Sequence, residues 1–426
     1  MSQIDPTKNR SALVPVFLTV FIDLLGFGIV IPLLPIYSQA YGASGTTLGL
    51  LFSSFSLMQL IFAPFWGRLS DKVGRRPVLI GGLIGTSISY VMFGLAESMT
   101  MLFVSRMLAG FFGANVATAQ AYVADVTTPA DRAKGMGMIG AAFGLGFTFG
   151  PLIGGFMVQW SMAMPGFFAA GLSLASAIVA FIMLYEPARH RSDATRIFGF
   201  ETVREAMRQP RVGTVLLLYF VALLAFSGFE SMFIRFGLAR FPEAFGISSA
   251  ITDPSMDDVM GAAKEAGLYM FGIGLLAAVI QGGFIRRLVP RYGETKLIVA
   301  GPLLLGLGFL IVGVAPNWWL VIAGCAVMPM GFGVNNPSLQ GLLSRAVTPD
   351  HQGAFLGLNQ SLGSLSRVLG PLIAGLVFDY GGPAQPFFLS AALLGVATLL
   401  ALRYHRRYAR SFEHEAEREA TVRGTA

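Results

Sequence analysis

Twelve long apolar stretches run through this chain of 426 residues, and they limit its possible folds more than any other feature. A helix needs about 20 apolar residues to cross the ~30 Å hydrocarbon core of a bilayer. Backbone polar groups in lipid must be satisfied within the segment, so each stretch has to be helical. We therefore predict an all-α membrane protein with twelve transmembrane helices. The predicted spans are 12–37, 47–66, 77–96, 101–123, 135–160, 166–186, 212–238, 264–284, 296–314, 318–342, 354–380 and 384–404.

The composition excludes a soluble domain and argues against nucleic-acid binding. Hydrophobic residues make up 54% and charged residues 12% of the chain, against about 25% charged residues in soluble domains. The net charge is +7, but nearly all Lys and Arg residues fall in alternate gaps between the spans. This positive-inside pattern predicts a multi-pass protein with both termini in the cytoplasm. The exceptions are Arg106 and Arg367 inside spans, and Arg235, Arg240 and Lys264 on the outer side.

A charged loop at 67–77 separates the second and third spans. Its sequence, Gly-Arg-Leu-Ser-Asp-Lys-Val-Gly-Arg-Arg-Pro, resembles the loop between helices 2 and 3 of the major facilitator superfamily. The resemblance implies two pseudo-symmetric six-helix bundles and a cytoplasmic gate. Asp71 can pair with an arginine of its own loop, and it can also cap the positive end of a helix, which in the superfamily is span 11. The expected gate residues are Gly67, Asp71, Gly74, Arg75 and Arg76.

An internal repeat supports the two bundles. A shift of 220 residues aligns the halves without a gap, and it pairs Phe112/Phe332, Gly113/Gly333, Asn115/Asn335, Gln120/Gln340, Gly150/Gly370, Pro151/Pro371 and Gly155/Gly375. The predicted parts are an N-terminal bundle at 1–186, a cytoplasmic linker at 187–211, a C-terminal bundle at 212–404 and a cytoplasmic tail at 405–426. Arg345 stands opposite Asp125 in the repeat, so charged chemistry is expected mainly in the first half.

A glycine-rich segment at 144–155 lies within the fifth span. It is not a nucleotide-binding loop, because it follows no strand and lacks Gly-Lys-Ser/Thr. Small residues of this kind pack helices closely, and the segment also resembles the antiporter motif of drug:proton transporters. Both interpretations predict a close contact with a span of the other half. The motif residues are Gly146, Gly150, Pro151, Gly154 and Gly155.

Asp23 and Arg106 are charged residues inside the first and fourth spans. An intramembrane carboxylate is expensive, so it should face a cavity, a partner or a proton. Both positions resemble charged positions of drug:proton antiporters, and the helical rise places them at similar depths. We predict that Asp23 carries the coupling proton and that Arg106 pairs with it in only some conformations. The alternatives are that Asp23 has a purely structural role and never titrates, or that Asp23 and Arg106 form a permanent buried ion pair.

Further polar and aromatic residues are candidates for lining a substrate cavity. Amides inside a membrane often bond across helices, and on spans 4 and 10 they could hold a polar group of a ligand. For Glu230 and Arg367, cavity lining and structural pairing remain equally open, and Glu230 can also pair with Arg235. The cavity candidates are Phe27, Gln59, Asn115, Gln120, Glu230, Asn335, Asn336, Gln340 and Arg367.

Taken together, the residues and the resemblance predict a proton-coupled antiporter that exports lipophilic drug-like molecules, similar to tetracycline-efflux-like transporters and contributing to antibiotic resistance. The expected setting is a bacterial inner membrane, with the bilayer and a small-molecule substrate as partners. We expect a monomer, no nucleic-acid partner, no metal, no enzymatic activity, and no cofactor apart from the proton. Spans 3, 8 and 9 lack the acidic and histidine residues of tetracycline pumps, so tetracycline itself is not predicted. The alternatives are a proton-coupled metabolite or sugar transporter, or a non-transporting membrane sensor.

Overall fold

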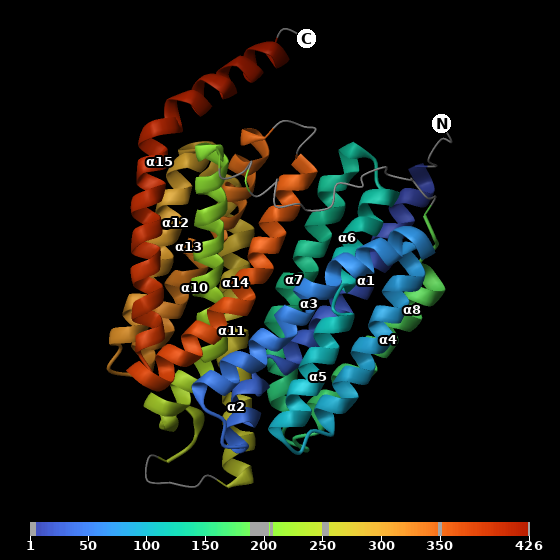
Figure 1. Cartoon of the computed structure of the whole chain (residues 1–426), viewed down its shortest axis with the longest axis vertical. Coiled ribbons are helices and arrows are strands. Elements are labelled where there is room, and N and C mark those ends of the chain that lie inside the picture. Colours follow the sequence, from blue (N-terminus) through green and yellow to red (C-terminus); the bar gives the residue numbers. More distant parts are fainter. Residues whose placement is uncertain (1–5, 188–203, 205–207, 249–254, 348–351, 425–426) are drawn as a thin grey trace. The chain divides into compact units, whose positions relative to one another are not determined.

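The computed structural model describes residues 6–187, 204, 208–248, 255–347 and 352–424. Within these residues the chain is helical throughout, with no strand. Figure 1 labels the helices in chain order. Their bounds are α1 (Pro6–Val30), α2 (Leu33–Ala40), α3 (Gly45–Val73), α4 (Arg75–Gly94), α5 (Met99–Phe112), α6 (Asn115–Val126), α7 (Pro129–Met157), α8 (Met164–Met183), α10 (Pro210–Arg240), the 3₁₀ helix η1 (Pro242–Phe245), α11 (Met256–Tyr292), α12 (Glu294–Val314), α13 (Trp318–Ala346), α14 (Gln352–Gly381) and α15 (Gln385–Gly424).

The prediction of twelve spans is confirmed, since 12 stretches of the described helices are long and apolar enough to cross a membrane. Each predicted stretch overlaps one of them. Two spans are interrupted near their middle or end: α1 and α2 share the first span, and α5 and α6 share the fourth. The second break falls at Gly113 and Ala114, so Asn115 becomes the first residue of a new helix. Most of the predicted linker at 187–211 lies outside the described residues.

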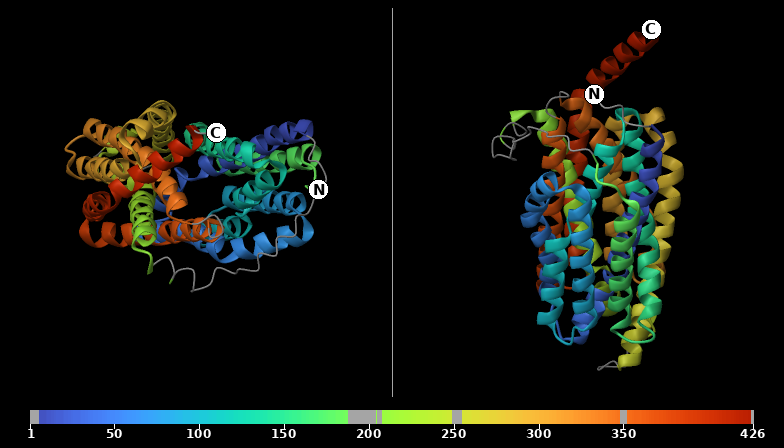
Figure 2. Two further views of the ribbon diagram at one scale, coloured as in Figure 1. Left: turned by 90° about the horizontal axis from the view of Figure 1, so that it is seen from above. Right: turned by 90° about the vertical axis from the view of Figure 1, so that its right-hand side faces the viewer.

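The chain packs as two compact units. The first contains Met1–Thr195, Glu230–Ala278 and Arg367–Pro383, and the second contains Arg196–Phe229, Val279–Ser366 and Ala384–Ala426. In the first unit α4 packs beside α5 and α8, and α1 packs beside α7 and α8, which can be followed in the blue-to-green helices of both views in Figure 2. The division of the chain by its repeat stays a prediction.

Each unit has its own apolar core. In the first unit, Leu24, Leu83 and Tyr122 belong to a buried cluster that joins α1, α4, α6, α7 and α8. In the second, Leu218, Ile298 and Leu342 belong to a cluster that joins α10, α12, α13, α14 and α15. Large apolar side chains also cover the outside of the helices, for example Ile182 and Phe181 of α8. An apolar exterior of this kind suits hydrocarbon rather than water.

Two close contacts inside the first unit follow the sequence repeat. Gly267 of α11 lies against Pro151 of α7, where an added Cβ would stand 2.4 Å from the proline carbonyl oxygen. Gly49 of α3 lies in the same way against Pro371 of α14, where an added Cβ would stand 2.3 Å from the carbonyl oxygen of that proline. Only glycine allows backbones to approach this closely. The Gly-Pro segments at 150–151 and 370–371 therefore make equivalent contacts, each with a helix from the opposite half of the sequence.

The same two helix pairs differ in polarity beyond these contacts. At the end of α14, the Asp379 carboxylate accepts hydrogen bonds from the backbone N–H groups of Gly45 and Thr46 and from the Thr46 hydroxyl, each at 2.7 Å. The residue 220 positions earlier is Gln159, whose amide donates one hydrogen bond to the Met260 carbonyl at 2.8 Å. A charged contact in one pair thus replaces a neutral contact in the other.

Candidate functional site

The loop at 67–77 forms a compact ionic cluster at one end of the first unit. Gly74 has a φ of +124°, which favours glycine, and it separates α3 from α4. The Arg75 guanidinium then pairs with Asp71 at 2.7 Å and with Asp125 of α6 at 3.0 Å, and it donates to the Ser70 hydroxyl at 2.6 Å. The predicted contact between Asp71 and an arginine of its own loop is therefore present. The predicted capping of span 11 by Asp71 stays a prediction.

Glu186 completes this cluster from beyond the end of α8. Its two carboxylate oxygens accept the backbone N–H groups of Arg75 and Arg76 at 2.7 and 3.0 Å. These N–H groups belong to the first turn of α4, where a negative charge is favoured. The Arg76 side chain donates to the Phe181 carbonyl and lies over the Phe181 ring, 5.1 Å from its centre. The loop is thus tied to α6 and α8 of its own unit.

The second half carries a related ion pair with reversed charges. Glu294 is the first residue of α12 and follows Gly293, whose φ is +73°. Its carboxylate pairs with Arg345 of α13 at 3.1 Å. In the first half, Arg75 likewise follows a glycine with positive φ at the start of a helix, and it pairs with Asp125, the repeat counterpart of Arg345. The pair of Glu294 and Arg345 thus reverses the charges of the pair of Arg75 and Asp125, and the expectation that charged chemistry belongs mainly to the first half stays a prediction.

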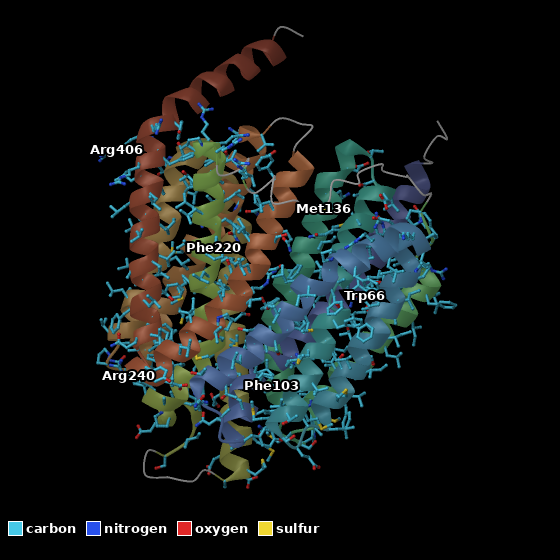
Figure 3. All side chains as sticks on the ribbon, in the orientation of Figure 1. Trp66, Phe103, Met136, Phe220, Arg240 and Arg406 are labelled. Atoms are coloured by element: carbon cyan, nitrogen blue, oxygen red, sulfur yellow. The ribbon has the colours of Figure 1, made fainter. Side chains whose placement is uncertain are left out.

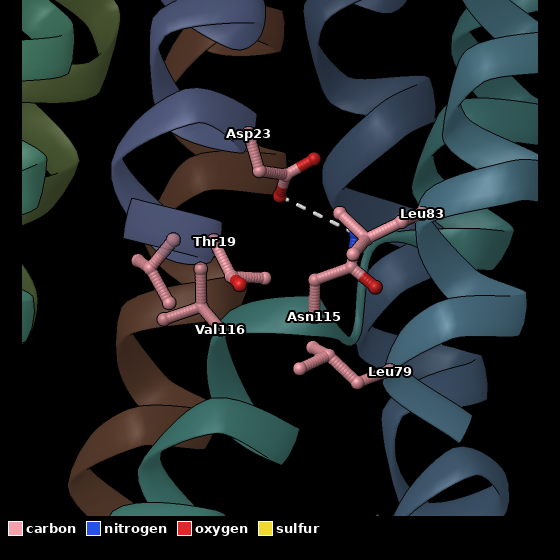
Figure 4. A pocket seen from close by; sticks show the side chains of 7 residues that line it. Thr19, Asp23, Leu79, Leu83, Asn115 and Val116 are labelled. Atoms are coloured by element: carbon pink, nitrogen blue, oxygen red, sulfur yellow. Dashed lines mark hydrogen bonds between the residues drawn. The ribbon is translucent and has the colours of Figure 1, made fainter. Parts of the chain in front are cut away.

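Asp23 lies in a narrow pocket between α1, α4 and α6. The Asn115 amide donates to its Oδ2 at 3.3 Å and contacts the Thr86 hydroxyl at 3.4 Å, while Oδ1 is shielded from solvent and has no hydrogen-bond partner among the described residues. Figure 4 shows Asn115 reaching toward Asp23. The pocket is too small to hold a water molecule, and it is lined by Thr19, Val20, Asp23, Leu79, Leu83, Asn115 and Val116.

The break between α5 and α6 places Asn115 in this pocket. Asn115 is 6% exposed and packs against Gly82 of α4, where an added Cβ would stand 2.2 Å from its Oδ1 atom. The amide is therefore held by a glycine on one side and by Asp23 on the other. Gln120, which was predicted beside it, is exposed on another face of α6.

Arg106 is fully buried, but it does not form the ion pair with Asp23 in this structure. Its guanidinium carbon lies 5.6 Å from the centre of the Tyr90 ring and 5.2 Å from that of Phe93, both on α4. Distances below about 6 Å are typical of cation–π contacts. Within the described part of the chain, its Nε and Nη2 atoms have no hydrogen-bond partner. The similar depths of Asp23 and Arg106 along their spans were thus not sufficient for the two side chains to pair in this structure.

The antiporter motif divides its contacts between two neighbours. Gly150 and Gly154 face α1, where added Cβ atoms would stand 2.5 Å from backbone atoms of Gly28 and Ile29. Gly146 packs on the same helix, against Leu24. Gly155 instead faces α11, where an added Cβ would stand 3.0 Å from the Ala263 carbonyl oxygen. The predicted approach of a span from the other half is confirmed at Gly155 and Pro151, and the other glycines pack within the first half.

The remaining aromatic and amide candidates in the first half lie on α1 and α3. Phe27 packs against Phe55 and Phe147, with ring centres 5.2 and 5.7 Å apart. Gln59 donates to the Gly113 carbonyl at 2.7 Å, at the break between α5 and α6. Further along α3, Trp66, labelled in Figure 3, donates to the Phe111 carbonyl at 2.6 Å. This part of α3 is thus aromatic and hydrogen-bonded to α5.

In the second half, Asn335 and Asn336 lie on α13. Asn335 is fully buried against Gly301 of α12, and both its amide atoms lack hydrogen-bond partners among the described residues. Gln340 is exposed on the same helix. Asn335 is thus packed inside the second half, whereas Asn336 and Gln340 lie one helical turn apart on a more exposed face of α13. Their lining of a cavity stays a prediction.

Glu230 and Arg367 interact electrostatically within the first unit. The alternative pairing of Glu230 with Arg235 is not adopted. Arg235 donates to the Ala43 carbonyl at 2.7 Å and lies over the Phe378 ring at 5.7 Å. Structural pairing of Glu230 with Arg367 and lining of a cavity by these residues both stay predictions.

Several residues in these contacts were not predicted as site residues. They are Tyr90, Phe93, Asp125, Glu186 and Asp379. For Asp125 and Glu186, the available signal was an acidic residue at the end of a span near a basic loop. The aromatic pair gave no signal, because Tyr and Phe are common throughout such spans.

Comparison with known proteins agrees with this geometry. The family model for the Major Facilitator Superfamily matches residues 16–285 and 240–424. The chain is 31% identical over 381 residues to the tetracycline resistance protein of class B from Escherichia coli, covering 88% of this chain and 90% of that protein. It is 28% identical over 392 residues to the quinolone resistance protein NorA from Staphylococcus aureus (strain COL), covering 92% and 96%.

Solved structures give the same fold. The crystal structure of the human organic anion transporter MFSD10 (TETRAN) shares 28% sequence identity and a TM-score of 0.69, covering 93% of this chain and 100% of that one. The nucleoside transporter NupG shares 14% identity and a TM-score of 0.74, covering 93% and 99%. The second likeness concerns the fold alone.

Proposed function

This chain belongs to the major facilitator superfamily, and we propose that it exports lipophilic drug-like molecules in exchange for protons by alternating access. Twelve candidate spans make it a multi-pass membrane protein. Its bacterial relatives are named for tetracycline and quinolone resistance, which supports an inner-membrane drug exporter. Such a protein is a transporter rather than an enzyme.

The pocket around Asp23 is the observation that carries the proposed proton coupling. Drug-sized ligands occupy pockets of about 300–1,000 Å³, whereas this one has no space for even a water-sized molecule. It holds one carboxylate, one amide donor and apolar walls. A carboxyl group in such surroundings can exchange a proton but has no room beside it for a drug. We therefore assign Asp23 to the proton and place the drug elsewhere.

Asn115 and Arg106 give the carboxyl group two different environments. The Asn115 amide donates to Asp23 in the present structure, while the Arg106 cation rests on aromatic rings. An approach of Arg106 to Asp23 would favour the ionised carboxylate, and its withdrawal would favour the protonated form. A conformational change that moves Arg106 would thereby load or release the proton.

The proton gradient supplies enough free energy for this exchange. One charge crossing about 150 mV yields about 3.4 kcal/mol. At about 1.4 kcal/mol per tenfold change, one proton per neutral molecule supports a gradient of about 300-fold. No cofactor other than the proton is needed, and we propose none.

The cluster around Arg75 is proposed to gate the cytoplasmic side. It links α3, α4, α6 and α8 into one body, so this end of the first unit can move without bending. Its positive charge supports a cytoplasmic location by the positive-inside rule. The same rule supports cytoplasmic termini. We further propose that the protein works as a monomer and binds no nucleic acid.

The substrate is proposed to be lipophilic and either cationic or zwitterionic. Tetracycline and quinolone exporters are among the relatives, and the aromatic residues on α1, α3 and α5 supply apolar surfaces. An organic anion is the second candidate. The likeness to a human organic anion transporter and the buried Arg106 cation favour it.

The test is transport by purified protein in liposomes with an imposed pH gradient. Tetraphenylphosphonium, norfloxacin, tetracycline and a lipophilic sulfonate represent the competing charge classes. We expect uphill movement of at least one of the first two in the wild type, and none in Asp23→Asn. Undiminished pH-driven transport by Asp23→Asn would refute the assignment of the proton to Asp23. Movement of the sulfonate alone would establish the anion alternative.

A further inference from the structure

The buried cation Arg106 and the carboxylate Asp23 are separated in this structure, and Tyr90 lies within electrostatic reach of both. Tyr90 is 2% exposed and belongs to α4. Among the described residues, no hydrogen bond joins the Tyr90 hydroxyl to a carbonyl group. The buried ring does not face lipid either. It is a large buried group close to two residues of opposite charge.

Backbone packing fixes the position of this ring. On one side the ring touches α1 at Gly26, where an added Cβ would stand 3.4 Å from the Cε2 atom of Tyr90. Gly26 lies one helical turn from Asp23. On the other side the Arg106 guanidinium lies 5.6 Å from the ring centre. The ring therefore fills the space between α1 and the cation.

Phe93 provides a second face for Arg106. Its ring centre lies 5.2 Å from the Arg106 guanidinium carbon. Behind it, the Tyr37 ring stacks on Phe93 at 5.3 Å, and the Tyr37 hydroxyl donates to the Met162 carbonyl. Phe93 is thus held by Tyr37 of α2. The two rings contact the same cation from different directions.

Few other groups act on Asp23. From α6 it meets the neutral amide of Asn115, and the nearby Ser173 hydroxyl of α8 donates to the Leu83 carbonyl at 2.9 Å. The face of α7 that packs on α1 is made of glycine and apolar residues. Tyr90 from α4 and Arg106 from α5 are the titratable or charged groups near this site within the described residues. A change in the position of Arg106 would consequently dominate the electrostatic surroundings of the carboxyl group.

We propose that Tyr90 is a positioning residue that holds the Arg106 cation away from Asp23, so that the carboxyl group retains its proton in this conformation. The proposal rests on the proposed function of Asp23 and deepens it. The aromatic face partly replaces a counter-ion for the buried cation. Passage of Arg106 beyond the ring would bring it to the carboxylate and release the proton.

The test follows the protonation of Asp23 directly, without a transported ligand. The carboxylic acid C=O band of purified full-length protein is recorded by infrared spectroscopy against pH, and Asp23→Asn identifies the band. In Tyr90→Leu, Arg106 can approach Asp23, so the midpoint of the band should move to lower pH by about one unit or more. Tyr90→Phe keeps the ring and should leave the midpoint unchanged.

A double substitution separates this effect from a general loss of packing. Tyr90→Leu combined with Arg106→Met should return the midpoint to that of Arg106→Met alone, because the approaching cation is gone. Phe93→Leu removes a ring of similar burial on the same helix and should leave the midpoint near that of the wild type. Melting temperatures establish that each variant is folded.

Two results would overturn the proposal. One is an unchanged midpoint in folded Tyr90→Leu, and the other is a shift that persists after Arg106 is replaced. An equal shift in Phe93→Leu would also overturn it, because the separation would not depend on Tyr90. Failure of the proposed function is recognised differently: no compound would be transported, whatever the infrared midpoints are.

Discussion

At the scale of single residues, a glycine decides whether Asn115 can reach Asp23. An alanine at position 82 would place its Cβ 2.2 Å from the Asn115 Oδ1 atom, so the amide would have to leave its place. Gly82→Ala should therefore weaken proton-coupled transport strongly and lower the stability by about 1–3 kcal/mol, the usual cost of overpacking. Liposome transport and thermal unfolding measure the two effects.

Gly81→Ala is the matched control for this prediction. Gly81 is the preceding residue on the same helix, and no atom lies within 4 Å of an added Cβ there. This variant should transport like the wild type. If Gly82→Ala and Gly81→Ala behave alike, the packing of Asn115 against α4 is not required for coupling.

The positions of Asp23 and Arg106 were predictable from the sequence, but their contacts were not. The residue types and depths of Asp23 and Arg106 identified both as intramembrane charges, because few other reasons exist for charged side chains in a span. Their partners were not predictable in the same way. Whether Arg106 meets a carboxylate or an aromatic face depends on which way each helix is rotated. A ring such as that of Tyr90 looks like any other apolar residue in the sequence.

At the scale of helices, Asp379 caps a helix that begins more than 300 positions earlier in the chain. The N–H groups of Gly45 and Thr46 stand in the first turn of α3 and have no acceptor within their own helix. Asp379 supplies that acceptor and a favourable negative charge. In Asp379→Ala, amide hydrogen exchange at Gly45 and Thr46 should rise by about tenfold, because hydrogen bonds to a charged group are lost.

Gln159→Ala provides the comparison, because Gln159 is the repeat counterpart of Asp379 and donates one neutral hydrogen bond. Exchange in the first turn of α3 should stay unchanged in that variant. Exchange mass spectrometry of the peptide that contains residues 43–50 reads both outcomes. Equal protection of this peptide in Asp379→Ala and the wild type would show that the carboxylate does not secure the helix end.

The loop at 67–77 gives a second prediction at the scale of elements. Arg75 contacts Asp71, Asp125 and Ser70 through its planar fork, and a lysine cannot reproduce several directed hydrogen bonds at once. Arg75→Lys should therefore lower the transport rate severalfold although the charge is kept. Arg68→Lys is the control, since Arg68 donates a single hydrogen bond to the Pro64 carbonyl. Equal rates in the two variants would argue against a gating role for the cluster.

At the scale of the whole chain, the long apolar stretches were enough to predict the number of candidate membrane spans. Length and apolarity define a span almost completely, because a bilayer admits few other structures. The contacts made by Pro151 and Pro371 were predictable in kind from their glycine neighbours. Their helix partners, and the exchange of a neutral for a charged contact at Gln159 and Asp379, depended on packing. Sequence periodicity does not encode which helices become neighbours.

The breadth of substrate selection is the last prediction at this scale. Apolar and aromatic contacts separate similar molecules by only about 1–3 kcal/mol, so a pocket with few fixed charges should accept several scaffolds. Expression in a bacterial host that lacks its own drug pumps should raise resistance to at least two chemically unrelated lipophilic compounds, such as ethidium and norfloxacin. The Asp23→Asn variant at equal expression is the control, and it should lose resistance to both compounds together, because one proton site serves every substrate. Resistance confined to tetracyclines would contradict the broad selection, and resistance that survives in Asp23→Asn would contradict the shared proton site.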